Sequence, residues 1–408
     1  MKRNFVHTSE SVTDGHPDKM CDQISDAIVD RFLEHDCYAR VAAECAVSLS
    51  VVFIAARFSS IIKVDFPNVA RKVIRRLGYV DHEFDYRTCS VLTSLKELEP
   101  SPEYVFDEKA ISDEEIDRIP ATEQVSVVGF ACNQSPTLMP LPIWLAHKLS
   151  RRVTEVRAEG ILPYLAPDGT SQVAVEYRDR KAFRIQSLTI NASQKDRTYP
   201  ELSKLRDDIR QAVIDVAFAD EPVRPDNDTR IFINYGGPLK LGGPSVHSGL
   251  TGRKNSVDTY GGYSRTSGSA LSGKDPLRID RVGSYAARYA AKNVVAAGLA
   301  EDCEVQLSYS IGLAHPVSVQ IDTGGTGRIS DEEITALVNE MFDFRLGGIV
   351  KQFQLRKLPA RSKRGFYRRL AAYGHFGRTD MDLPWELTDK AELLNASVAQ
   401  GVGVQAEY

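Results

Sequence analysis

Hydrophobic and polar positions along the chain switch between helical and strand spacing at short intervals. Between residues 19 and 36, Ile24, Ile28 and Phe32 recur every four positions among acidic residues, which predicts an amphipathic helix. The apolar run 41–56 predicts strand structure, residues 67–77 predict a helix that begins at Pro67, and residues 89–95 predict another strand. Helices and strands are therefore expected to alternate in this part of the chain.

The same mixture recurs further along the chain. Strand patterns occupy 125–131, 172–177, 182–190 and 303–311, and helical patterns occupy 140–159, 201–218 and 283–299. An acidic, proline-punctuated stretch at 96–124 and a glycine-rich stretch at 236–283 separate these patterns. We therefore predict an α+β fold of three similar α+β domains, at residues 1–101, 114–232 and 233–408, although no repeat is visible at the level of residues.

Length and composition agree with a globular protein of several domains. A chain of 408 residues is too long to fold around one small hydrophobic core. Its content of 42% hydrophobic and 26% charged residues is ordinary for a globular protein. A net charge of −4 provides no overall attraction to nucleic acid or to an acidic membrane, so neither is expected as a partner and any anion site must be local. The expected partner is a small molecule.

The sequence carries no sign of a membrane or secretory segment. It contains no N-terminal apolar core of the signal-peptide kind and no run of about 18 uncharged apolar residues. The six cysteines lie far apart without a CxxC pair, which favours reduced thiols over a disulfide framework or a zinc site. We therefore expect a cytoplasmic protein whose chemistry does not depend on cysteine.

The first candidate motif lies just before the first predicted helix, in the segment ESVTDGHPDK at 10–19. There His16 stands between Gly15 and Pro17 and is followed by Asp18. This arrangement offers an imidazole and a hard oxygen ligand at a helix N-terminus, where anions are also favoured. A turn of this composition also occurs for structural reasons alone.

Two glycine-entered segments supply the cations. Arg253 and Lys254 follow the glycine turn that begins at 249, and the segment 272–280 adds Lys274, Arg278 and Asp280. Carboxylates that hold magnesium and cations that hold phosphate oxygens suit a bound polyphosphate. A solvated basic turn is the simpler alternative for Arg253 and Lys254. No Walker A sequence is present, so a P-loop enzyme is excluded.

Taken together, these segments resemble the S-adenosylmethionine synthase family. The matching segments, in the family's order and spacing, are GHPDKM at 15–20, GLTGRKNSVDTY at 249–260, SGKDPLRID at 272–280, YAARY at 285–289 and AYGHFG at 372–377. The resemblance implies an enzyme that moves the adenosyl group of ATP onto a small nucleophile and releases triphosphate, which the same site cleaves to pyrophosphate and phosphate. It also implies a homodimer or homotetramer with active sites between subunits.

The resemblance further implies roles for single residues. Catalytic residues would be His16, Arg253 and Lys274. Contacts to ATP and its triphosphate would come from His16, Asp168, Arg253, Lys254, Lys274 and Arg278. Asp18 and Asp280 would hold Mg²⁺, and Glu44 would hold K⁺. Glu123 and Gln124 match a gating loop that is glycine-rich in the family and stiffer here.

The chain departs from the family's pattern on the acceptor side. Arg57 and His247 stand where the family has a glutamate and an aspartate, and Leu98 stands where it has a glutamine. Each change removes a partner for the ammonium group of methionine, and Arg57 repels it. We therefore expect an anionic acceptor in place of methionine. The alternatives are ordinary synthesis from L-methionine, a non-catalytic regulatory subunit and a triphosphatase.

A further feature is a basic run between residues 351 and 369 that contains no acid. Its cations are Lys351, Arg356, Lys357, Arg361, Lys363, Arg364, Arg368 and Arg369. We expect this run to form a solvated surface, and the alternative is a patch that binds an anion or nucleic acid.

Overall fold

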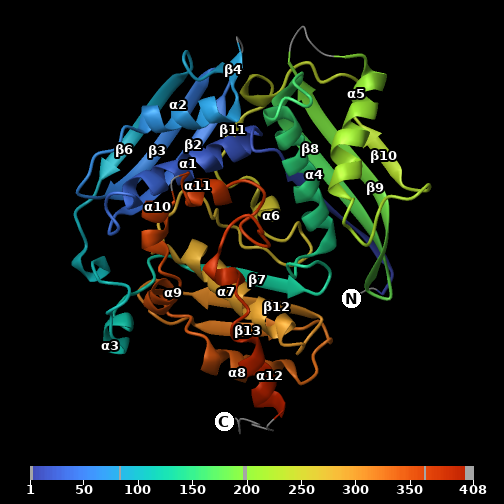
Figure 1. Ribbon diagram of the computed structural model, residues 1–408. Coiled ribbons are helices and arrows are strands. Elements are labelled where there is room, and N and C mark those ends of the chain that lie inside the picture. The colour runs from blue at the N-terminus through green and yellow to red at the C-terminus, as the bar shows by residue number, and fades with distance from the viewer. Residues whose placement is uncertain (1–2, 82–83, 196–199, 363, 400–408) are drawn as a thin grey trace.

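The computed structural model describes residues 3–81, 84–195, 200–362 and 364–399, which form three main β-sheets backed by helices (Figure 1). The first sheet has the order β11-β2-β3-β6: Gly249–Leu250, Arg40–Ser48, Val51–Ser59 and Ser90–Glu97. The second has the order β1-β8-β9-β10: Phe5–Val12, Leu165–Arg178, Lys181–Gln194 and Arg230–Ile233. The third has the order β13-β12-β7: Ser318–Asp322, Asp302–Tyr309 and Val125–Cys132. β4 (Val80–Asp81) and β5 (Phe84–Asp85) form a small ribbon.

The two four-stranded sheets share one topology. In each, an antiparallel hairpin leads through a helix to a strand parallel to the second hairpin strand: β2-β3-α2-β6 and β8-β9-α5-β10. In each, a strand from elsewhere in the chain, β11 or β1, pairs antiparallel at the opposite edge. β7 likewise joins the β12–β13 hairpin of the third sheet. The α+β fold is confirmed, whereas the contiguous domain boundaries stay a prediction because the sheets exchange strands across them.

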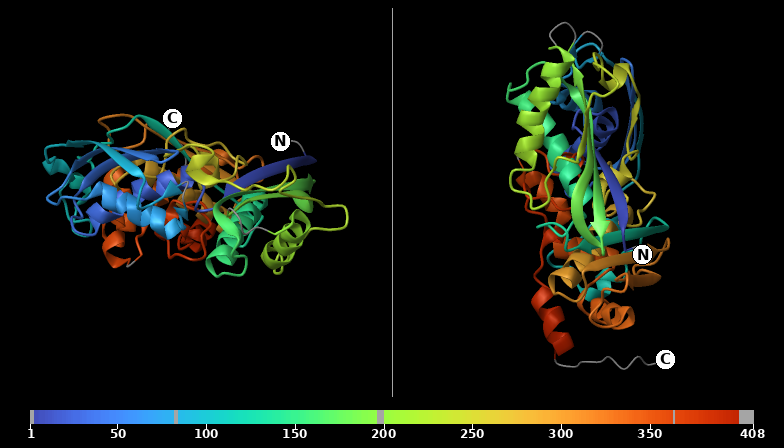
Figure 2. Two further views of the ribbon diagram at one scale, coloured as in Figure 1. Left: turned by 90° about the horizontal axis from the view of Figure 1, so that it is seen from above. Right: turned by 90° about the vertical axis from the view of Figure 1, so that its right-hand side faces the viewer.

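One long helix backs each sheet. They are α1 (Pro17–Leu33) behind β2, α4 (Leu141–Ala158) behind β8 and β1, and α7 (Ile279–Ala296) behind β7 and β12. Seen from above, the strands lie toward one side of the molecule and the helices toward the other (Figure 2). The outer face of the first sheet therefore stays open in the single chain, and Phe53 and Leu92 on it are 42% and 54% exposed.

The shorter helices have the following bounds. They are α2 (Phe66–Leu77), α3 (Asp113–Ile116), α5 (Leu202–Ile209, continued by a π-helical turn at Arg210–Asp215), α6 (Asn255–Asp258), α8 (Asp331–Met341), α9 (Leu346–Phe353), α10 (Leu358–Arg361), α11 (Tyr367–Leu370) and α12 (Ala391–Ala399). Short 3₁₀ turns lie at Pro102–Tyr104, Gly243–Ser245, Leu355–Lys357 and Pro384–Glu386. No helix in the described part of the chain combines the length and the apolar character that a membrane span requires.

The α1 helix differs from its prediction in one respect. The spacing predicted a solvent-facing acidic side, yet Asp22, Asp26 and Asp30 are all buried. Asp26 forms an ion pair with Arg281 of α7 at 2.6 Å, and Asp30 accepts the N–H groups of residues 366–368. This acidic side of α1 is thus buried against the C-terminal part of the chain, because charged groups and backbone N–H groups there donate hydrogen bonds to its carboxylates.

The basic run at 351–369 forms only part of the solvated face that its sequence predicts, with Arg361 and Arg364 exposed. Arg356 is buried and forms an ion pair with Glu108, and Lys357 forms one with Asp107. The run therefore packs partly against the acidic, proline-punctuated stretch, and two segments of opposite charge neutralise each other. Lys363 lies outside the described residues.

Candidate active site

The turn between β1 and α1 holds His16 in a fixed position. The Tyr79 hydroxyl donates to the Gly15 carbonyl at 2.6 Å, and the Thr13 hydroxyl donates to the Pro167 carbonyl at 2.7 Å. A Cβ atom on Gly15 would lie 2.4 Å from the Pro167 side chain, so this close approach requires glycine. His16 caps α1, and its Nδ1 accepts the Asp18 N–H at 3.2 Å.

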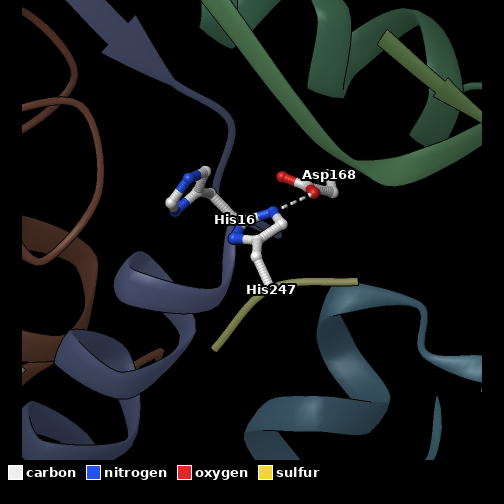
Figure 3. Close-up of side chains that lie close together, drawn as sticks. All are labelled: His16, Asp168 and His247. Carbon is white, nitrogen blue, oxygen red and sulfur yellow. Dashed lines mark hydrogen bonds and ion pairs between the residues drawn. The ribbon is translucent and has the colours of Figure 1, made fainter. Parts of the chain in front are cut away.

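Asp168 and His247 meet beside this turn (Figure 3). The carboxylate of Asp168, on β8, accepts the Gly243 N–H and bonds to His247 Nε2, each at 2.8 Å. The rings of His16 and His247 have centroids 5.0 Å apart. Ligand atoms of His16, Asp168 and His247 all lie within 4.8 Å of one another.

Burial and hydrogen bonding set the protonation of these groups. Burial lowers the pKa of His16 to about 4, against the opposing charges of Asp168 and Asp18, so the ring is neutral near pH 7. The hydrogen bond to Asp168 raises the pKa of His247. Burial by itself would raise the pKa of Asp168. The hydrogen bond from His247 and the charge of His16 have a larger, opposite effect, so the pKa of Asp168 is lowered.

Three predicted site residues complete this group. Asp18 accepts the Leu250 N–H at 3.0 Å, and the Arg253 guanidinium lies 3.6 Å from the same carboxylate oxygen. Lys254 Nζ lies 3.4 Å from Glu10 Oε1. We call His16, Asp18, Asp168, His247, Arg253 and Lys254 the His16 cluster.

The remaining predicted phosphate ligands form a second group at the N-terminus of α7. Lys274 Nζ lies 2.7 Å from Asp280 Oδ2, and Arg278 forms an ion pair with Glu123 of the predicted gating loop. Asp280 lies in the first turn of α7, where the helix dipole favours negative charge. Gln124 is exposed beside this group. We call Glu123, Lys274, Arg278 and Asp280 the Lys274 cluster.

Two independent measures show that the clusters are separate within one chain. Leu250 pairs with Ala46 of β2 while Lys274 bridges Ala42, a spacing of four residues that corresponds to about 13 Å along a strand. Along α1, Asp18 accepts the N–H of Leu250, and Asp26, eight residues and about 12 Å further, accepts that of Gly273. Glu44 lies exposed on β2 between the two clusters.

The three residues predicted to line the acceptor pocket lie in two different parts of the chain's structure. Arg57 of β3 is exposed and lies opposite Ala42, the residue that Lys274 bridges. Leu98 follows β6, and its N–H donates to the Phe58 carbonyl at 2.7 Å. His247 belongs to the His16 cluster. Arg57 and Leu98 lie at neighbouring strands and His247 lies in the other cluster, so their joint role stays a prediction.

Sequence reasoning missed the residues that hold the site. Tyr79 and Thr13 fix the His16 turn, and Glu10 pairs with Lys254. It also assigned Asp168 and His247 to different substrates and missed that they bond to each other. Glu10 and Lys254 are 244 residues apart in the chain, and Asp168 and His247 are 79 apart, so no local pattern could have indicated these pairs.

Two groups of cations and carboxylates lie at helix N-termini and glycine turns, an arrangement typical of enzymes that bind phosphate groups. Models of the N-terminal, central and C-terminal domains of S-adenosylmethionine synthetase match residues 4–100, 118–239 and 241–387. The chain belongs to the S-adenosylmethionine synthetase family and is an enzyme of the transferase class.

Curated relatives agree with this membership. S-adenosylmethionine synthases of Rippkaea orientalis and Gloeothece citriformis are 46% and 47% identical over 98% of this chain and 98% and 99% of their own. That of Microcystis aeruginosa is 45% identical over 98% of this chain and 100% of its own length.

Proposed function

We propose that this chain is an S-adenosylmethionine synthase that uses ATP and L-methionine. The observation that carries the proposal is identity of 45–47% along nearly the full length to proteins of that name. In this reaction the methionine sulfur forms a bond to C5′ of ATP, the bond from C5′ to oxygen breaks, and the electron pair leaves with triphosphate. Hydrolysis of triphosphate to pyrophosphate and phosphate follows.

The charges of the two clusters suit this leaving group. Arg253, Lys254 and Lys274 offer cations to the negative charge that develops on triphosphate, and preorganised charge is commonly the largest contribution to catalysis. His16 Nδ1 accepts the Asp18 N–H, so the neutral ring carries its proton on Nε2. That N–H can donate to the bridging oxygen as the bond to C5′ breaks.

The donor set fits the expected cofactors. Asp18 and Asp280 carry buried carboxylates, the hard oxygen ligands that Mg²⁺ prefers, and Glu44 offers an exposed carboxylate for K⁺. Bound Mg²⁺ would neutralise part of the triphosphate charge. All six cysteines are free, which supports the proposed cytoplasmic location.

We further propose that the active enzyme is a dimer. Leu250, Ala46, Phe53 and Leu92 stand in one row across the first sheet, and the three larger side chains are 42–54% exposed. An open apolar row on the exposed face of a sheet supports burial against a second copy. In a two-fold dimer, the His16 cluster of one subunit could face the Lys274 cluster of the other and complete the site.

An anionic acceptor is the second candidate, and one observation favours it. Lys274, Ala42, Arg57 and Lys96 follow one another in register across the first sheet, which gives three cations in one row. Within the described part of the chain, Arg57 forms no ion pair. A carboxylate, sulfonate or phosphate beside it would gain a charge-assisted contact of about 1.5–3 kcal/mol.

One assay separates these possibilities. The enzyme is incubated with ATP, Mg²⁺ and K⁺, and with methionine, a panel of anionic nucleophiles or no acceptor, and products are identified by mass. We expect S-adenosylmethionine with methionine. A different 5′-substituted adenosine would support the second candidate, phosphate without an adenosyl product would indicate a hydrolase, and no turnover would indicate a regulatory subunit.

A further inference from the structure

We propose that His16, His247 and Asp168 form a binding site for a divalent transition-metal ion of the Zn²⁺ class. Two imidazoles and one carboxylate are a donor set that such ions prefer, whereas Mg²⁺ prefers oxygen ligands alone. This site is therefore distinct from the expected magnesium and potassium positions. His247, which stands where the resemblance implies an aspartate, supplies the second nitrogen.

The geometry requires only a small adjustment. The three ligand atoms lie within 4.8 Å of one another, and His247 Nε2 is 2.8 Å from Asp168 Oδ2. Bonds of about 2.0–2.1 Å in tetrahedral geometry separate neighbouring ligand atoms by about 3.3 Å. His16 would move inward and His247 slightly outward, which side-chain rotation can provide.

An unpartnered oxygen gives independent support. Asp168 is 8% exposed, and its Oδ1 is buried with no hydrogen-bond partner among the described residues. In Figure 3 this second oxygen lies on the side of the carboxylate toward His16. A buried carboxylate oxygen without a partner costs free energy, which a metal ion bound there would offset.

The surrounding charges permit a dication. Arg253 and Lys254 are the nearby cations, and they already pair with Asp18 and Glu10. The Asp18 carboxylate adds negative charge beside the ring, with its Oδ2 3.9 Å from His16 Nδ1.

Metal and ATP would exclude each other at His16. The ring cannot ligate a metal ion and also donate its proton to the leaving triphosphate, so the ion should inhibit adenosyl transfer in competition with ATP. This consequence rests on the proposed function, whereas metal binding itself does not.

The test uses Co²⁺ as the probe with the full chain, freed of metal and without ATP or Mg²⁺. We expect one Co²⁺ per chain, with absorption typical of nitrogen and oxygen ligands and without a thiolate charge-transfer band. His247→Gln and Asp168→Asn each remove a ligand, so each should weaken binding by about ten- to a hundredfold or more, since loss of an outer-shell partner alone costs that much. His315→Gln is the matched control, since exposed His315 pairs with Asp117 at 3.1 Å and is not part of the three-residue cluster.

Circular dichroism and melting curves show whether each variant is folded. Failure of the wild-type protein to bind Co²⁺ stoichiometrically, or equal binding by His247→Gln, would overturn the proposal. Because the absorption readout needs no turnover, it stands even if no S-adenosylmethionine is formed. With an active enzyme, Zn²⁺ should raise the apparent KM for ATP.

Discussion

At the scale of single residues, His16 illustrates how burial prepares a site for chemistry. The ring is 6% exposed and carries a pKa of about 4, so it is neutral although two carboxylates lie nearby. A neutral imidazole can donate one proton without adding a permanent charge to the site. Local sequence gave the position of this residue, but only its surroundings set its protonation state.

Lys274 should be needed for turnover rather than for folding. Lys274→Ala removes a cation that neutralises the leaving triphosphate, so kcat should fall by roughly a hundredfold or more. Steady-state kinetics measures this, and the exposed Lys204→Ala serves as control. Near-normal turnover of the Lys274 variant would refute the role assigned to it.

Two buried histidines should make the protein sensitive to acid. Burial lowers the pKa of His147 and of His375 well below the ordinary value, so the folded state holds both rings neutral. Below about pH 6.5 the unfolded chain binds protons that the folded state rejects. These two rings should therefore lower the free energy of unfolding as the pH falls, by at most about 1.4 kcal/mol per pH unit for each ring.

Urea unfolding between about pH 7 and pH 5 checks this sign. His375→Gln should reduce the slope by one ring's contribution, whereas the exposed His315→Gln should keep the wild-type slope. Equal slopes for the wild type and His375→Gln would contradict the prediction, because this comparison cancels the opposite contributions of Asp30 and Asp258, whose burial raises the pKa of each to about 7.

At the scale of elements, the close packing of α7 on β7 depends on a missing side chain. A Cβ atom on Gly129 of β7 would lie 2.0 Å from the Ala287 carbonyl carbon of α7. Backbone cannot move aside as a flexible side chain can. Gly129→Ala should therefore destabilise the protein by about 2 kcal/mol or more.

Thermal or urea unfolding measures this effect. Gly268→Ala is the matched control, because an added Cβ there meets no atom of the described residues within 4 Å. Equal free energies of unfolding for the two variants would show that α7 and β7 can move apart without loss of stability.

At the scale of the whole molecule, the open face of the first sheet should decide assembly. Phe53→Asp puts a charge into the apolar row of that face, so the proposed dimer should dissociate and adenosyl transfer should be lost with it. Light scattering after size-exclusion chromatography measures the mass. Ile161→Asp, at a position 48% exposed, is the control. A wild-type monomer with full activity would refute the dimer.

The sequence alone determined the identity of most elements. Apolar spacing predicted α2 and β7 within one residue of their observed limits, because a helix or strand that packs on one face repeats its apolar side chains at a fixed period. The motifs around His16 and Lys274 likewise indicated the family, since their glycines, cations and carboxylates are short-range features of the chain.

Only the tertiary structure decided which of these residues meet. The edge strands β1 and β11 join sheets formed by distant segments, and His16 meets Asp168 and His247 across 152 and 231 positions of sequence. Sequence spacing carries no information about such contacts, because burial of complementary faces selects them during folding. The division of the predicted site into two clusters, and the burial of the acidic side of α1, follow from that packing.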